Sequence, residues 1–110
     1  MNFKKVNNIS GWIICAIACT VFTMTREASV SFWDCGEFIS CAYKLQISHP
    51  PGAPLFILLG RLFIILFSGN LNAATPNLHA AVDVNLLSSI SSGFTILFLF
   101  WTITHFAKKM

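Results

Sequence analysis

The sequence predicts an all-α membrane protein in which two transmembrane helices are joined by an outer loop with short juxtamembrane or re-entrant helices. Hydrophobic residues make up 55% of the 110 residues, charged residues make up 10%, and the mean hydropathy is +0.72. A soluble domain of this size carries far more charge and less apolar surface. Two stretches without a charged residue, 6–25 and 84–107, are each long enough for a helix to cross a hydrocarbon core about 30 Å thick.

The first span is expected at about residues 9–25, because residues 7–11 are polar and prone to turns. A basic start followed by an apolar run is also how secretory signals begin. No small-x-small cleavage site follows Met24, however. We therefore expect an uncleaved span.

A short helix is predicted at about residues 32–45, and two of the chain's four acids lie near its start. Asp34 and Glu37 are three residues apart and share one helix face. On one interpretation they cap the helix, because both Ser31 before Asp34 and Asp34 before Glu37 have capping-box spacing. On the other they perform chemistry, since the neighbouring aromatic residues anchor the segment at lipid headgroups, where an acid is costly and usually functional.

The His-Pro-Pro-Gly run at 49–52 predicts a sharp, rigid turn, because a residue before proline is disfavoured in the helical region. The turn folds an apolar helix at 55–67 back towards the acids. Thirteen residues with an arginine in the middle are short for a span, so this helix is expected in or just under the outer interface. The alternative, a third span, would place Lys108 and Lys109 on the outer side and stays open at this point. His49 would approach Asp34 and Glu37 as a proton carrier or hydrogen-bond partner, although a lone histidine before a turn is more often structural.

Arg61 is the only charged residue between Lys44 and Asp83. On one interpretation it snorkels, with its stem in apolar surroundings and its guanidinium at the headgroups. On the other it clamps a lipid phosphate, for which the guanidinium fork is well shaped. The sequence leaves both open.

The second span is expected at about residues 84–107, after a polar loop at 68–81. Serines and a glycine at 88–93 make one end of this span small and polar, which suits packing against other helices. The half at 94–106 is bulky and lipid-like. We expect that a chain this short does not supply the helices against which 88–93 would pack.

Lysines flank the two spans and predict the topology. Lys4 and Lys5 precede the first span, and Lys108 and Lys109 follow the second. Because positively charged flanks stay in the cytoplasm, both termini are expected there and the loop at about 26–83 on the outer side. The chain would then be a multi-pass protein of the cell inner membrane.

The four cysteines predict packing and no covalent link. Cys15 and Cys19 lie one helical turn apart and form a stripe of small residues with Gly11. Cys35 and Cys41 would face the oxidising side, but on one helix a spacing of six points them in different directions, so no disulfide is expected. None of the cysteine spacings matches a zinc site.

Three strings of residues resemble a known group of proteins. They are Ser-Phe-Trp-Asp-Cys-Gly-Glu-Phe-Ile at 31–39, Ala-Tyr-Lys-Leu at 42–45 and His-Pro-Pro-Gly-Ala-Pro-Leu-Phe at 49–56. They resemble the amino-terminal signature of large polytopic bacterial proteins related to a eukaryotic transmembrane protein O-mannosyltransferase. Those proteins are GT-C glycosyltransferases, which use a sugar carried on polyprenyl or dolichyl phosphate.

The resemblance implies a site and a reaction. Asp34 matches the catalytic base of the first outer loop, Glu37 matches the second acid of the Asp-x-x-Glu pattern, and His49 matches the start of a His-Pro-Pro element. We expect Asp34 and Glu37 to be catalytic, and His49 and Arg61 to bind substrate. The reaction would be an inverting transfer of a sugar from a polyprenyl-phosphate donor to a protein hydroxyl on the outer side of the membrane, in which a carboxylate accepts the hydroxyl proton. A cation could stabilise the departing phosphate.

The resemblance also implies partners. The expected partners are the lipid-linked sugar donor, an acceptor protein, the lipid bilayer and the remaining helices of a longer protein. No nucleic acid is expected as a partner. Residues 1–110 would be the amino-terminal fragment of a GT-C transmembrane domain, inactive alone. No cofactor and no metal site are expected from this chain, although the two acids could share a cation with residues elsewhere.

Two rival hypotheses remain open at this point. The chain could be a small, non-enzymatic two-span membrane protein that packs against a larger partner through its small-residue faces. Its acids would then be helix caps and its arginine a headgroup anchor. It could also be part of a transporter with a re-entrant helix at 55–67, but no inverted repeat supports this.

Overall fold

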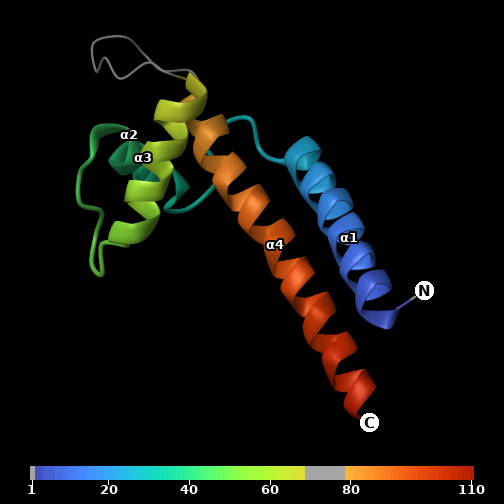
Figure 1. Cartoon of the computed structure of the whole chain (residues 1–110). Coiled ribbons are helices and arrows are strands. Elements are labelled where there is room, and N and C mark those ends of the chain that lie inside the picture. Colours follow the sequence, from blue (N-terminus) through green and yellow to red (C-terminus); the bar gives the residue numbers. More distant parts are fainter. Residues whose placement is uncertain (1, 69–78) are drawn as a thin grey trace. The chain divides into compact units, whose positions relative to one another are not determined.

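The computed structural model describes residues 2–68 and 79–110. Over these residues the chain forms helices and connecting segments only, so the predicted all-α fold class is confirmed. The helices are α1 (Phe3–Thr25), α2 (Cys35–Lys44), α3 (Pro54–Ser68) and α4 (Ala80–Lys109) (Figure 1). Most of the polar loop predicted at 68–81 lies outside the described residues.

The chain divides into two compact units. One, here called the span unit, contains residues 1–25 and 89–110, and the other, the loop unit, contains residues 26–88. Helix α4 begins in the loop unit and ends in the span unit. The candidate spans therefore meet in one unit, and the segment with the acids, the histidine turn and the short helices makes up the other.

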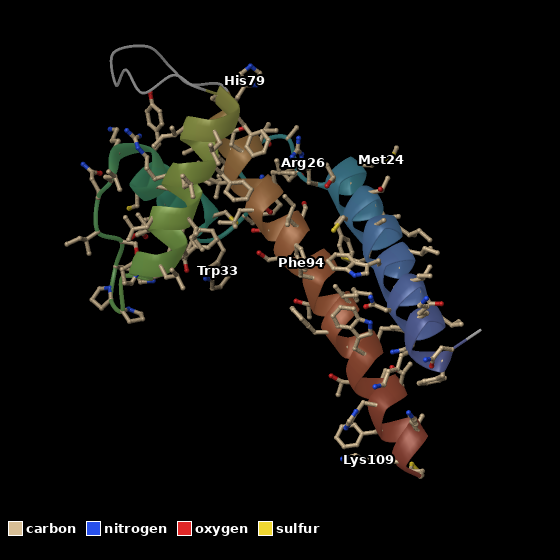
Figure 2. The ribbon with its side chains drawn as sticks, in the orientation of Figure 1. Met24, Arg26, Trp33, His79, Phe94 and Lys109 are labelled. Atoms are coloured by element: carbon tan, nitrogen blue, oxygen red, sulfur yellow. The ribbon has the colours of Figure 1, made fainter. Side chains whose placement is uncertain are left out.

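Helices α1 and α4, of 23 and 30 residues, are long and apolar enough to cross a membrane. Both begin earlier than predicted. At the start of α1, the Asn2 side-chain oxygen accepts a hydrogen bond from the Lys4 backbone N–H at 3.3 Å, and its carbonyl accepts from Lys5 at 2.9 Å. Asn2 thus caps the helix, and residues 7–11 lie inside it. Lys109 closes α4, where a cation complements the helix dipole (Figure 2).

Small residues let the two helices of the span unit approach closely. A Cβ atom built on Gly93 of α4 would overlap the Cys19 sulfur of α1, and one built on Gly11 would overlap the Trp101 indole. The Trp12 ring meets the Trp101 ring edge-on, with centroids 6.1 Å apart. The predicted small-residue stripe on α1 is confirmed as a packing surface. The expectation that this chain supplies no partner for residues 88–93 is wrong, because α1 is such a partner.

The loop unit has its own apolar core. Helix α2 packs against α3, and buried side chains from α2, α3 and the first turns of α4 meet between them: Ile39, Ala42, Ile64, Ala80 and Val84. Gly60 of α3 allows the approach, since a Cβ there would lie 3.0 Å from the Ala42 Cβ. Helix α3 has 15 residues and extends about 22 Å, short of a membrane span. Its Leu55 and Leu66 remain mostly exposed.

Helix α2 is shorter than the predicted 32–45 at both ends. It begins at Cys35 because Trp33 has a left-handed backbone (φ 69°), which interrupts helical geometry. It ends at Lys44 because Leu45 is left-handed (φ 52°) and Gln46 donates a hydrogen bond back to the Cys41 carbonyl at 3.0 Å. Helix α3 agrees with its prediction to within one residue at each end and begins on Pro54, a favoured first position.

Candidate functional site

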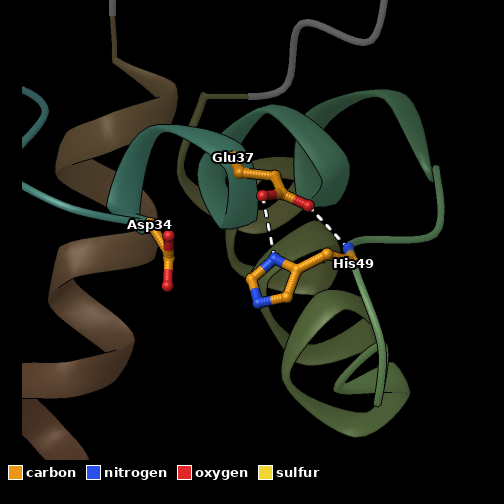
Figure 3. Close-up of side chains that lie close together, drawn as sticks. All are labelled: Asp34, Glu37 and His49. Carbon is orange, nitrogen blue, oxygen red and sulfur yellow. Dashed lines mark hydrogen bonds and ion pairs between the residues drawn. The ribbon is translucent and has the colours of Figure 1, made fainter.

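Glu37 and His49 form a two-point hydrogen-bonded pair in the loop unit. The backbone N–H of His49 donates to Glu37 Oε1 at 2.6 Å, and the ring Nδ1 lies 2.9 Å from Glu37 Oε2 (Figure 3). Both carboxylate oxygens are therefore engaged by one residue twelve positions further along the chain. The sequence-based expectation that the turn brings His49 to this acid is confirmed.

The turn after α2 explains how His49 reaches Glu37. The backbone N–H of Gly52 donates to the His49 carbonyl at 2.9 Å, and Gly52 itself has φ 89°, which a glycine adopts without strain. Phe38 supports the imidazole, with ring centroids 5.9 Å apart, and the Phe38 ring meets the Phe56 ring of α3 edge-on at 5.8 Å. The histidine is thus held between α2 and the start of α3.

Asp34 lies at the N-cap position of α2, but its side chain makes no capping hydrogen bond. Glu37 does not complete a capping box either, because its oxygens face His49. The capping interpretation of these two acids is therefore not the arrangement that the structure shows. One ligand-type atom from each of Asp34, Glu37 and His49 lies within 4.8 Å of the others (Figure 3).

Hydrogen bonding shifts the protonation of the pair in opposite directions. The His49 backbone N–H, with its ring, lowers the pKa of the Glu37 carboxyl below the ordinary 4.5. The hydrogen bond to Glu37, with its charge and a smaller contribution from the charge of Asp34, raises the pKa of His49 above 6.5. Both shifts favour the charged form of the pair, in which a carboxylate lies beside an imidazolium.

The side chains of the cluster are accessible from outside the loop unit. The side chains of His49 and Glu37 are 49% and 40% exposed. Trp33, directly before Asp34, is 93% exposed (Figure 2). A carboxylate that makes no capping hydrogen bond, such as that of Asp34, can accept a proton, and an imidazolium can donate a hydrogen bond to an anion. Two carboxylates and an imidazole are also a donor set that a divalent cation accepts.

Arg61 does not join this cluster. Its Nη1 donates to the backbone carbonyl of Tyr43 in the last turn of α2, whereas Asp34 lies at the other end of that helix, about 13 Å away along the axis. The guanidinium is partly buried and links α3 to the last turn of α2. Three of the four residues predicted for the site are thus brought together, and the fourth is placed elsewhere.

The sequence reasoning missed two residues beside the cluster. Phe38 was expected to be one of the apolar, aromatic residues that anchor the segment at the headgroups, yet its ring also packs against the His49 imidazole. Ser48 received no role, yet it is 4% exposed and its hydroxyl has no partner among the described residues. Buried hydroxyls are nearly always hydrogen-bonded. The adjacency of Ser48 to the His-Pro-Pro run was the one signal available for it.

Comparison with known proteins points to one family. A family profile described as the protein O-mannosyl-transferase TMEM260 N-terminal domain matches residues 34–110. Protein O-mannosyl-transferase tmem260 of Dictyostelium discoideum is 32% identical over 100 residues, or 90% of this chain. Protein O-mannosyl-transferase TMEM260 of Mus musculus is 39% identical over 88 residues, or 80% of this chain. No solved structure gives a significant match.

The family match begins at Asp34, the first residue of the cluster, and contains all three of its members. The aligned part is 12% of the length of the Dictyostelium relative and 11% of the mouse relative. The match covers most of this chain, and the chain therefore belongs to the family of the protein O-mannosyl-transferase TMEM260 N-terminal domain.

Proposed function

We propose that this chain supplies the general base of a membrane glycosyltransferase that moves a sugar, mannose by the family's description, from a polyprenyl-phosphate donor to a protein hydroxyl. The observation that carries the proposal is the Asp34 carboxylate, which is not used for capping and lies beside the Glu37–His49 pair. Family membership supports the transferase class. A lipid-borne donor agrees with two candidate spans in a chain of this length.

Each residue of the cluster receives a role. Asp34 accepts the proton of a serine or threonine hydroxyl as its oxygen attacks the anomeric carbon, and the bond from that carbon to the phosphate oxygen breaks. No covalent sugar intermediate forms, so the configuration inverts. His49, as the imidazolium, donates a hydrogen bond to the departing phosphate, whose negative charge grows.

Glu37 acts through His49. Sequence considerations placed it with the catalytic acids, but both of its oxygens already accept hydrogen bonds from His49. We therefore assign it a positioning role, in which it orients the imidazole and favours its charged form. Arg61 links α3 to α2 through the Tyr43 carbonyl, and its predicted contact with a lipid phosphate is a separate proposal.

The same proposal includes the orientation. The loop unit, with the cluster, faces the outer side of the membrane, and both termini face the cytoplasm, because Lys4, Lys5, Lys108 and Lys109 flank the candidate spans. The rival hypothesis of a small non-enzymatic partner protein is weakened by two observations. The chain belongs to a transferase family, and the small-residue faces on which that hypothesis depended pack against each other within this chain.

A donor-exchange assay tests the reaction class. Membranes that contain the protein carrying this chain are mixed with a serine- and threonine-rich acceptor peptide and one donor of labelled mannose. The mannose of the donor is linked either to a polyprenyl phosphate or to a nucleotide. We expect labelled peptide only with the lipid-linked donor. Transfer from the nucleotide-linked sugar in membranes depleted of polyprenyl phosphate would overturn the donor assignment.

A further inference from the structure

The span unit contains a groove that the proposed reaction does not use. It lies between the first turns of α1 and the last turns of α4 and has a volume of about 640 Å³. Cationic, polar and aromatic side chains line it, among them Lys4, Lys5, Asn8, Trp101, His105 and Lys108. The loop unit's cluster contributes nothing to this groove, so the groove needs its own explanation.

The charged side chains at this end of the span unit all have one sign. All four acids of the chain lie between residues 27 and 83, in the loop unit, so no carboxylate side chain of the span unit offsets the lysines. The Lys108 ammonium sits 5.2 Å from the centroid of the Phe3 ring, a cation–π distance. That contact holds one ammonium at the groove, whereas its neighbour Lys109 is not part of the lining.

We propose that this groove binds the phosphate headgroup of an anionic phospholipid. Lysine ammonium groups and an asparagine amide are donors, and charge-assisted bonds from lysine to phosphate are the stronger of the two. The groove lies at the end of two candidate spans, the level at which lipid headgroups are found. The Phe3 and Trp101 rings give the lining an apolar part that suits the glycerol and upper acyl chains of a lipid better than a free anion.

Anionic lipid could also be retained by diffuse electrostatic attraction to the flanking lysines. The experiment must distinguish this attraction from a specific site in the groove, here called a built site. Diffuse attraction depends on the number of charges near the surface and not on which lysine carries them. A built site depends on Lys108 and not on Lys109. The two adjacent lysines therefore form a matched pair, since Lys108→Gln and Lys109→Gln remove the same charge from the same helix turn.

The experiment measures lipid retention by the protein that carries this chain, purified in detergent, with phosphatidylglycerol or phosphatidylcholine added and bound lipid counted by native mass spectrometry. We expect preferential retention of phosphatidylglycerol and a loss of about tenfold in its affinity in Lys108→Gln, the size of one lost charge-assisted bond. Lys109→Gln should change the affinity less than about twofold, and Lys108→Arg should retain most of it. Circular dichroism verifies that each variant keeps its helices.

Three outcomes would overturn the proposal. Equal losses in Lys108→Gln and Lys109→Gln would show diffuse attraction only. Equal retention of phosphatidylcholine would remove the role of anionic charge. Full competition by glycerol phosphate, at the concentration that displaces the lipid, would show a site for a free phosphate and not for a lipid.

Discussion

At the scale of single residues, the chemistry of the site depends on how three side chains divide their hydrogen bonds. His49 occupies both oxygens of Glu37, once through its backbone and once through its ring. Asp34 is left without a capping bond although it holds the N-cap position. Two acids three positions apart therefore differ in role, because among the described residues a donor is directed at Glu37 and not at Asp34.

The Glu37–His49 pair predicts a shift that can be measured directly. In Glu37→Gln the imidazole loses its charged acceptor, so the pKa of His49 should fall towards its ordinary value. Histidine-detected NMR titration of the protein in detergent measures this change. Glu27→Gln, which removes a charge outside the cluster, should leave the pKa of His49 where it is. An unchanged His49 pKa in Glu37→Gln would mean that the pair does not form in solution.

The same pair predicts a pH window for its contribution to stability. The pKa of His49 is raised above 6.5, so its contribution is complete below pH 6.5 and is lost as the pH rises through the raised pKa. The pKa of Glu37 is lowered below 4.5, so its contribution is present above pH 4.5 and is lost as the pH falls through the lowered pKa. The stability difference between wild type and Glu37→Gln should therefore be largest between pH 4.5 and 6.5 in thermal unfolding.

At the scale of helices, the contacts between α1 and the end of α4 depend on the absence of side chains. Gly93 faces Cys19, whose backbone nitrogen would lie 3.3 Å from an added Cβ. Helices in lipid gain nothing from burying apolar surface against each other, so close packing is their main source of association. The small residues are consequently where the span unit is most sensitive to substitution.

The Gly93 contact predicts a clear cost for added volume. Gly93→Val should push the two helices apart and destabilise the span unit by about 1–3 kcal/mol, the usual cost of overpacking. Ser92→Val places the same valine side chain at the exposed neighbouring position and should change stability by no more than about 0.5 kcal/mol. Unfolding in mixed micelles with increasing dodecyl sulfate measures both. Equal stability of the two variants would contradict the packing of α1 on Gly93.

At the scale of the whole molecule, the sequence predicted which elements exist better than it predicted how they meet. Charge-free runs, the capping-box spacing of the acids and the prolines at 50–54 were sufficient for four helices and for the approach of His49 to the acids, because these are local patterns. They could not predict that Trp33 would turn left-handed and free Asp34 from capping. Nor could they pair Arg61 with the Tyr43 carbonyl, which is eighteen residues away and depends on packing between helices.

The proposed orientation predicts which thiol can be labelled from outside. Cys35 is partly exposed, whereas Cys41 is buried, so sequence position alone would overstate the reactivity of Cys41. An impermeant maleimide added to intact cells should label Cys35, and Cys35→Ser should abolish nearly all of the labelling. A reporter fused after Met110 should be active only in the cytoplasm. Reporter activity on the outer side would contradict a two-span orientation.

The central claim, that Asp34 is the general base, is tested most directly by Asp34→Asn in the protein that carries this chain. Asparagine keeps the size of the side chain and is a good N-cap, so thermal stability and donor binding should change little. It cannot accept a proton, so the rate of sugar transfer should fall by at least about a hundredfold, while Glu27→Gln should transfer at the normal rate. Near-normal transfer by a well-folded Asp34→Asn variant would contradict the account.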